Sequence, residues 1–193
     1  MPRLVDPAIP AGRMRAMAQP SLEVGHGVTM RPWTTSDAPA VMEAFADPAI
    51  RYWHMRSIES VEEASDWIDA WRERWQAESN ASWALVGDDG RVRGQIALRG
   101  VNLGMGASEV SYWVVPVARG RGIASAALTR LATWSFDELG LRRLWLMHAV
   151  DNAPSCKVAV RAAFEPEGTL REALRHTDGW HDMHVHGRLA SDG

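Results

Sequence analysis

The chain has 193 residues, of which 46% are hydrophobic and 23% are charged, and its formal net charge is −3. These values are ordinary for a globular protein of one domain, and the slight negative charge disfavours a dedicated nucleic-acid binder. One cysteine, Cys156, excludes an internal disulfide framework, and no apolar run reaches the length of about 18 residues that indicates a membrane span. The N-terminus lacks the apolar core of a signal peptide. We therefore expect a cytoplasmic protein without nucleic-acid or membrane partners.

The chain divides into a proline-rich start and one domain. Residues 1–26 hold four prolines and predict an irregular leader with room for one short element. Residues 27–190 alternate strand-like and helix-like patterns without an internal repeat. The predicted elements are a strand at 28–31, helices at 38–45 and 61–75, strands at 82–86, 91–101 and 109–115, a helix at 122–139, a strand at 143–150, a helix at 152–163, and strands at 168–174 and 181–189. This order predicts an α/β (α+β) fold, a mixed sheet of about seven strands with helices on both faces.

Local signals set several of these boundaries. Asp47-Pro48 should stop the first helix, and Ser60 opens a capping box at the start of the second. Asp88-Asp89-Gly90 predicts a hairpin between two strands. Asn152 should cap the helix whose first turn contains Pro154.

The most informative stretch is the turn between the strand at 109–115 and the helix at 122–139. Gly120 and Gly122 leave the backbone free to turn several N–H groups toward one point, and the following helix adds a partial positive charge. Arg119 and Arg121 add two full charges. These features predict an anion site, and they suit a pyrophosphate best.

This turn has other possible interpretations. A Gly-Arg-Gly turn can also serve only to reverse the chain between a strand and a helix. A Walker P-loop is excluded because the chain contains no Gly, four residues, Gly-Lys-Ser/Thr. A dinucleotide fingerprint is excluded because Ser125 stands where that pattern needs glycine or alanine.

The turn resembles the acetyl-coenzyme A signature of the GNAT superfamily of N-acetyltransferases: Gln/Arg, two residues, Gly, one residue, Gly/Ala. Arg119, Gly122 and Ala124 occupy these positions. Residues 151–164 resemble the Asn-x-x-Ser helix of the ribosomal-protein-serine/alanine N-terminal acetyltransferase branch, and the opening 28–37 resembles that branch as well. Ala163 departs from the branch, which usually has glycine there, so a left-handed helix cap at this point is expected to be strained or absent.

The resemblance implies the GNAT fold with a mostly antiparallel sheet, and acetyl-coenzyme A as co-substrate. It implies that the strand before the turn splays from its neighbour and pairs with the pantetheine arm, which Asn152 also bonds. The pyrophosphate would lie on the amides of the turn. The residues assigned to the cofactor are Trp113, Val114, Val115, Arg119, Gly120, Arg121, Gly122, Ile123, Ala124, Ser125 and Asn152.

Two residues are candidates for the chemistry. Glu109, on the strand that leads to the turn, is the candidate base and would act through water, although it can equally be a solvated strand-end charge. Ser155 is the candidate acid for the departing thiolate by resemblance, and is otherwise a first-turn helix residue. A strong base is optional if the acceptor is an α-amine, because its pKa of about 7.8 leaves part of it neutral at pH 7.

Cysteine and histidine chemistry is considered and not favoured. Nothing in the sequence pairs Cys156 with a base, so direct transfer is favoured over a covalent intermediate. Four histidines lie near the C-terminus, and on a strand His184 and His186 would share a face with Asp182. A zinc site needs three or four converging ligands, and ordinary strand and loop histidines are the simpler interpretation. No metal is expected; the four histidines are His176, His181, His184 and His186.

These features predict an N-acetyltransferase that moves an acetyl group from acetyl-coenzyme A to a primary amine, with a protein N-terminus as the first candidate acceptor. Two alternatives stay open: a small-molecule amine such as a polyamine, amino acid or antibiotic, and a coenzyme A-binding protein without catalysis. Loops near Tyr52-Trp53-His54 and the final hairpin near Trp180 should set the acceptor. Analogy suggests a homodimer through the C-terminal strands.

Overall fold

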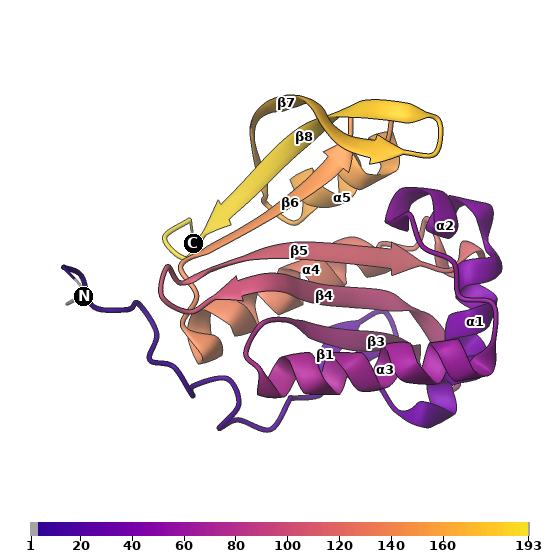
Figure 1. The fold of residues 1–193 in the computed structure, drawn as a ribbon, viewed down its shortest axis with the longest axis horizontal. Coiled ribbons are helices and arrows are strands. Elements are labelled where there is room, and N and C mark those ends of the chain that lie inside the picture. The colour runs from indigo at the N-terminus through magenta and orange to yellow at the C-terminus, as the bar shows by residue number, and fades with distance from the viewer. Residues whose placement is uncertain (1–3, 193) are drawn as a thin grey trace.

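The computed structural model describes residues 4–192, which fold around one eight-stranded sheet (Figure 1). The strand order is β1-β2-β3-β4-β5-β6-β8-β7, and every neighbouring pair is antiparallel except the parallel pair β5–β6. The expected mixed, mostly antiparallel sheet is confirmed. The strands are β1 Leu22–Gly25, β2 Val28–Pro32, β3 Ala81–Gly87, β4 Val92–Asn102, β5 Ala107–Val114, β6 Arg143–Ala149, β7 Glu165–His176 and β8 Gly179–Leu189.

The sheet has one strand more than the seven expected, because the proline-rich start of the chain contributes β1, which pairs with β2. Upstream, residues 4–21 form no helix or strand, yet Ile9 and Met14 are buried in the core. The carboxylate of Glu78 accepts hydrogen bonds from the amides of Gly12 and Met14 at 2.6 and 2.7 Å. This segment is therefore packed against the domain.

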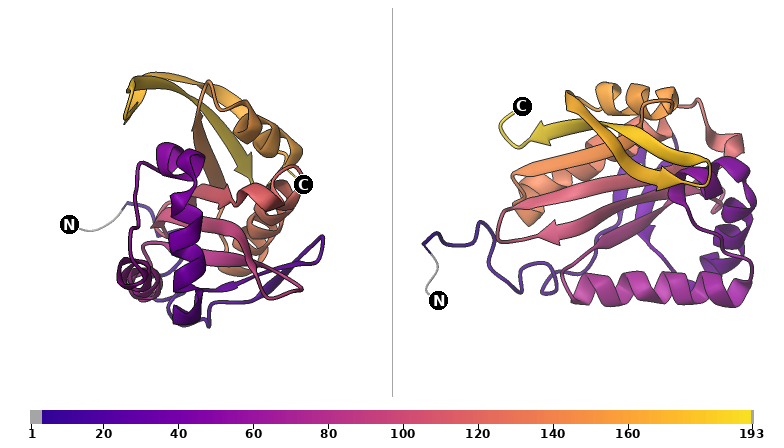
Figure 2. Two further views of the ribbon diagram at one scale, coloured as in Figure 1. Left: turned by 90° about the vertical axis from the view of Figure 1, so that its right-hand side faces the viewer. Right: turned by 45° about the horizontal axis from the view of Figure 1, so that its top comes forward.

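Helices cover both faces of the sheet, as expected (Figure 2). On one face lie α1 (Ala38–Ala46) and α3 (Val61–Gln76), and on the other lie α4 (Ile123–Trp134) and α5 (Ala153–Arg161). Tryptophan supplies much of the apolar area that holds these layers together. Seven of the ten tryptophans are buried: Trp33, Trp67, Trp71, Trp75, Trp83, Trp113 and Trp134.

The stretch after α1 differs from the expectation. Asp47 and Pro48 do end α1, but they also begin a second helix, α2 (Pro48–His54). Asp47 Oδ1 accepts a hydrogen bond from the amide of Ile50 at 2.9 Å, and Pro48 occupies the first turn, where a missing N–H costs nothing. The same dipeptide stops one helix and caps the next, and α2 carries His54 to the candidate site.

The helix after the glycine turn was expected to run through residue 139. It is α-helical only to Trp134 and continues as a π-helical turn over Ser135–Leu139. Gly140 then ends it in the left-handed conformation with φ of 89°, which glycine adopts readily at a helix C-terminus.

The left-handed cap at the end of α5 is present although the residue is alanine. Ala163 has φ of 58°, the amide of Phe164 donates to the carbonyl of Ala159 at 3.0 Å, and the amide of Ala163 donates to that of Val160 at 3.1 Å. These two bonds make a Schellman motif. Of the two expected outcomes, a strained cap or no cap, the structure has the strained one, because a Cβ is held in a conformation that favours glycine.

The substitution Ala163→Gly should raise the free energy of unfolding by about 1 kcal/mol. Glycine removes the strain of the left-handed conformation, and this gain exceeds the cost of the greater conformational entropy of the unfolded chain. Urea unfolding measures the change. The control Ala70→Gly lies inside α3 and should lower the same quantity by about 1 kcal/mol. A loss of stability in both variants would show that Ala163 is not strained.

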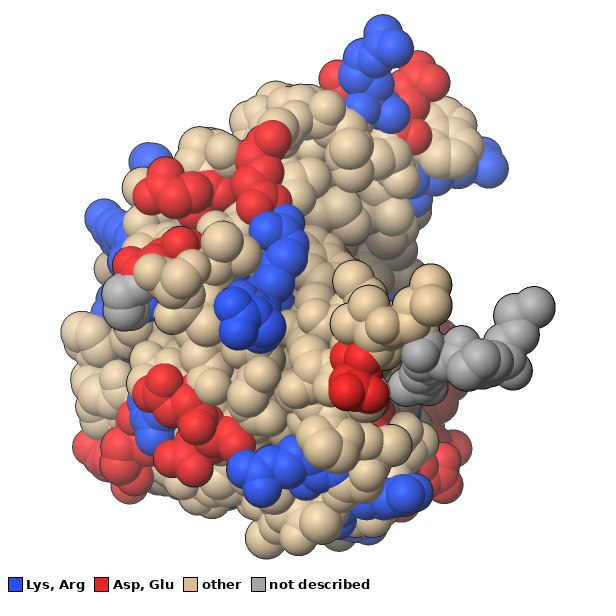
Figure 3. Space-filling model, turned by 90° about the vertical axis from the view of Figure 1, so that its left-hand side faces the viewer, with Lys and Arg blue, Asp and Glu red and all other residues tan. Residues whose placement is uncertain are grey.

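Charges of both signs share the surface. Figure 3 shows Lys and Arg side chains beside Asp and Glu side chains on one face of the molecule, without a broad field of one sign. Interspersed charges of this kind act over short distances in physiological salt. Within residues 4–192, no helix combines the length and the apolar character that a bilayer crossing requires.

Candidate acetyl-coenzyme A site

Strands β5 and β6 pair along only three residues and then separate. The parallel ladder joins Ala107 to Arg143 and ends with Glu109 opposite Trp145. Both strands continue, β5 to Val114 and β6 to residue 149, without a further ladder between these described segments. Figure 1 shows the two strands diverging toward the end that carries α2. The splayed edge that the resemblance implied is present.

Along β5, the main-chain N–H and C=O groups of every second residue point toward the opening. The amide of Val115 donates to the carbonyl of Arg93 at 2.9 Å, so the residues in phase with Val115, including Trp113, direct their main chain to β4. Tyr112 and Val114 have the opposite phase and face the opening. Of the three residues expected to offer main-chain groups to the pantetheine arm, Val114 is therefore the one placed to do so.

The turn that follows presents free amides. Gly120 and Gly122 have φ of 76° and 77°, and a Cβ on Gly120 would meet no atom within 4 Å. Conformation, not crowding, therefore requires glycine at position 120. The first bond of the α4 ladder runs from the amide of Ala126 to the carbonyl of Gly122 at 3.0 Å. The amides of residues 123–125 precede that ladder and, with the positive end of the helix, can bind an anion.

Arg119 joins this turn to α2. Its Nε donates to the carbonyl of Val114 at 3.0 Å and its Nη2 donates to Asp47 Oδ1 at 2.6 Å. Burial disfavours the ionised form of Asp47, but hydrogen bonds from Arg119 and the amide of Ile50 outweigh it and hold the pKa of Asp47 below its usual value. The positive charge of Arg119 is thus partly neutralised by a carboxylate. The backbone amides of the turn have no such partner among the described residues and are the more available hydrogen-bond donors for an anion.

A cavity of about 510 Å³ lies among α2, the opening of β5, the glycine turn and α5. Arg119, Lys157 and Arg161 line it, and none of the described residues lining it is Asp or Glu. Arg121 lines a neighbouring pocket, and Glu109 and Val115 lie outside the cavity lining. The other predicted site residues all line it: Trp113, Val114, Arg119, Gly120, Gly122, Ile123, Ala124, Ser125, Asn152 and Ser155.

Glu109 lies where β5 and β6 part. Burial raises the pKa of its carboxyl, and the nearby Arg99, opposite in the β4–β5 register, works against that shift. A raised pKa suits a proton acceptor. Because Glu109 does not line the cavity, a role as base requires a connecting water, as the sequence analysis assumed.

Ser155 sits in the first turn of α5. Asn152 caps this helix, as predicted, and its Oδ1 accepts from the amide of Ser155 at 3.2 Å. The hydroxyl oxygens of Ser155 and Tyr112 are 2.7 Å apart. Burial raises the pKa of Tyr112 to about 12, so the phenol keeps its proton at neutral pH. The sequence analysis missed Tyr112, although strand alternation already set its side chain opposite to that of Trp113.

His54 also lines the cavity, and the sequence analysis named it only as part of a segment expected to set the acceptor. Its Nε2 lies 3.1 Å from the carbonyl of Tyr112, and since a carbonyl only accepts, this nitrogen carries the proton. Burial lowers the pKa of His54 to about 4, and the charges of Arg99 and Arg56 act in the same direction. His54 is therefore neutral at pH 7.

The opening in the sheet, the free amides and the cationic lining fit a long molecule with amide groups at one end and phosphates at the other. Fold and site together define an acyltransferase that uses an acyl-coenzyme A. The family model of the GNAT acetyltransferase domain matches residues 28–165, and the chain belongs to this family.

Known relatives agree with this assignment. The uncharacterized N-acetyltransferase YoaA of Bacillus subtilis is 25% identical over 159 residues, 81% of this chain and 90% of that protein. The ribosomal-protein-serine acetyltransferase of Escherichia coli is 34% identical over 82 residues, 42% of this chain and 46% of that protein. The chain is thus an acetyl-coenzyme A-dependent N-acetyltransferase, as the sequence analysis expected.

A solved structure shows the same fold. RimL, a ribosomal alpha-N-protein acetyltransferase in complex with coenzyme A, superposes with a TM-score of 0.79 at 22% identity. The match covers 88% of this chain and 98% of RimL. At this identity, the likeness establishes the architecture alone.

His54 should titrate with a pKa of about 4 in the folded protein, well below its ordinary 6.5. As the pH falls, His54 is protonated at a higher pH in the unfolded chain than in the folded protein. The stability that neutral, buried His54 contributes is therefore complete above pH 6.5 and is lost as the pH falls toward 4. Histidine ring NMR signals, assigned by their absence in His54→Gln, measure the midpoint. A midpoint near 6.5 would contradict the burial of this ring.

The substitution Gly120→Asp should weaken coenzyme A binding at least about tenfold, about 1.4 kcal/mol, because it would place a carboxylate beside the diphosphate position expected at this turn. Isothermal titration calorimetry measures the affinity. Gly90→Asp is the matched control, since Gly90 has φ of 75° and equally open space but lies in the β3–β4 turn. Equal affinities of the two variants would remove the glycine turn from the site.

Proposed function

We propose that the acceptor of the acetyl group is the α-amine at the N-terminus of a protein or peptide. The observation that carries this proposal is the absence of any carboxylate among the described residues that line the cavity. Two similar proteins, a ribosomal-protein-serine acetyltransferase and an alpha-N-protein acetyltransferase, act on protein N-termini or ribosomal proteins by name, which supports it.

The acceptor's pKa decides how much base an enzyme needs. At pH 7, an α-amine with pKa of about 7.8 is neutral in about one molecule of seven, and a lysine with pKa of about 10.4 in about one of 2500. A lysine acetyltransferase must therefore offset roughly 3.5 kcal/mol more. With no lining carboxylate and with the pKa of His54 at about 4, the cavity suits an amine that loses its proton readily in water.

Charge argues against the main small-molecule alternative. Arg119, Lys157 and Arg161 all line the cavity. These cations attract the phosphates of coenzyme A and repel a polyamine, which carries several positive charges. A polyamine site would be expected to have acidic walls.

In this proposal each group has a defined task. The amides of residues 120–125 hold the diphosphate, and the amide of Val114 donates to the thioester oxygen as negative charge develops on it. Ser155 gives a proton to the departing thiolate, and Tyr112 keeps Ser155 oriented through the 2.7 Å contact. The amine forms its bond to the carbonyl carbon as the C–S bond breaks. Its surplus proton leaves to water, with Glu109 as the candidate acceptor, and Ser155 regains a proton from water, so that the products are the amide and the free thiol.

A panel of acceptors tests the proposal, with release of free thiol as the readout. Peptides with a free N-terminus should react faster than the same peptides acetylated at the N-terminus with an internal lysine, and faster than spermidine. Log kcat/KM should rise with slope one up to about pH 8 and then level off, because the pKa of the α-amine is about 7.8. Preference for lysine or spermidine would overturn the proposal.

Ser155→Ala should lower kcat about 100-fold and leave the Kd for coenzyme A within about twofold, because it removes a proton donor from the transition state only. The helix cap persists because Asn152 bonds the backbone amide of residue 155. Stopped-flow turnover and calorimetry separate the two quantities. An unchanged kcat would take Ser155 out of the mechanism.

A further inference from the structure

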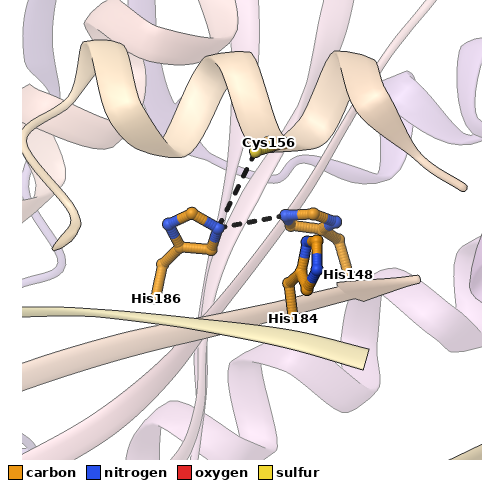
Figure 4. Close-up of side chains that lie close together, drawn as sticks. All are labelled: His148, Cys156, His184 and His186. Carbon is orange, nitrogen blue, oxygen red and sulfur yellow. Dashed lines mark hydrogen bonds between the residues drawn. The ribbon is translucent and has the colours of Figure 1, made fainter. Parts of the chain in front are cut away.

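Four side chains that can bind a metal converge between α5 and the strands β6 and β8 (Figure 4). Each offers one ligand atom, and these atoms all lie within 4.8 Å of one another. None of the four lines the cavity described above. They are His148 of β6, Cys156 of α5, and His184 and His186 of β8.

Hydrogen bonds fix the two buried imidazoles in one tautomer. His148 Nδ1 lies 2.8 Å from the carbonyl of Ala149, and His186 Nδ1 lies 3.1 Å from the carbonyl of Phe164. A carbonyl can only accept, so each Nδ1 carries the proton and each neutral ring has its lone pair on Nε2. This arrangement, an Nδ1–H bonded to a carbonyl, is the usual support of a metal-binding histidine.

The two lone pairs point at each other. His148 Nε2 and His186 Nε2 are 3.2 Å apart, and both rings are buried. Two facing acceptors repel unless a positive species lies between them, either a proton or a metal ion. Cys156 Sγ lies 4.0 Å from His186 Nε2, which adds a ligand that becomes negative when it binds a metal.

We propose that His148, Cys156, His184 and His186 form a zinc site. Tetrahedral Zn²⁺ with Zn–N of about 2.05 Å and Zn–S of about 2.3 Å separates two nitrogens by about 3.3 Å and nitrogen from sulfur by about 3.6 Å. In the structure the nitrogens of His148 and His186 are 3.2 Å apart, and the sulfur of Cys156 is 4.0 Å from the nearer of them. The widest separation among the four ligand atoms, up to 4.8 Å, must close by about 1 Å, which side-chain rotation can supply. One thiolate and three imidazoles are ligands that suit zinc.

Four protein ligands close the coordination sphere, which is typical of a structural rather than a catalytic zinc. The ligands come from three elements, so the ion would fix α5 to the β6–β8 side of the opening. Cys156 follows Ser155 directly, and the site would therefore position the candidate acid. It would also occupy the one thiol that could otherwise compete as a nucleophile. No metal was expected from the sequence, where His184 and His186 were interpreted as ordinary strand histidines; His148 and Cys156 are distant from them in the chain and were not grouped with them.

Metal analysis of the whole chain, expressed without a histidine tag and purified without chelator, tests the proposal. We expect about one zinc per chain, and after chelation and dialysis the protein should take up one Zn²⁺ again. Substituted Co²⁺ should show thiolate-to-metal charge-transfer absorption. In Cys156→Ala, zinc affinity should fall at least tenfold and this absorption should disappear.

Two controls keep the result decisive. His181→Ala alters the separate group of His176, Asp178 and His181 and should retain the zinc. Thermal unfolding in chelator should give similar melting temperatures for Cys156→Ala and the unaltered protein, which shows that the variant folds. The proposal fails if the unaltered protein binds no Zn²⁺, if Cys156→Ala binds it equally well, or if His181→Ala loses it. No acetyl-coenzyme A or acceptor enters these measurements, so their failure leaves the proposed acceptor untouched.

Discussion

The site depends on one constraint, the early end of the parallel ladder between β5 and β6. Because pairing stops at Glu109 opposite Trp145, the outward main chain of the next residues of β5 has no partner strand. Gly120 and Gly122, both left-handed, then turn the chain so that the first amides of α4 face the same region. In the proposed binding mode, recognition uses these backbone groups, so the fold itself would supply the specificity for the phosphates and amides of a coenzyme.

The parts that could be predicted from sequence are those fixed by neighbours in the chain. The hairpin at Gly90, the cap at Asn152 and the glycine turn each depend on a few consecutive residues with defined backbone preferences. The main error is also local and has a physical reason, because Pro48 ends one helix and also begins α2, which was not predicted. Ala163 takes the strained one of the two expected outcomes, because the Schellman bonds hold it in a conformation that its residue type disfavours.

The parts that could not be predicted are side-chain contacts across long stretches of chain. Tyr112 and Ser155 are 43 residues apart, and His148 and His186 are 38 apart. Their contacts depend on the register of β6 against β8 and on how α5 docks, neither of which a periodic pattern specifies. His54 is a similar case, because its place in the cavity follows from α2, which the sequence analysis did not include.

The proposed zinc site and the cavity share α5, so the position of Ser155 depends on both.

The central claim, however, concerns the backbone amides of residues 120–125. Amide hydrogen exchange resolved by NMR, with and without saturating coenzyme A, tests it most directly. Exchange at residues 120–125 and at Val114 should slow markedly on binding, while the β3–β4 turn at Gly90 should not change. Unaltered exchange at residues 120–125 with coenzyme A bound would contradict a diphosphate held by this turn.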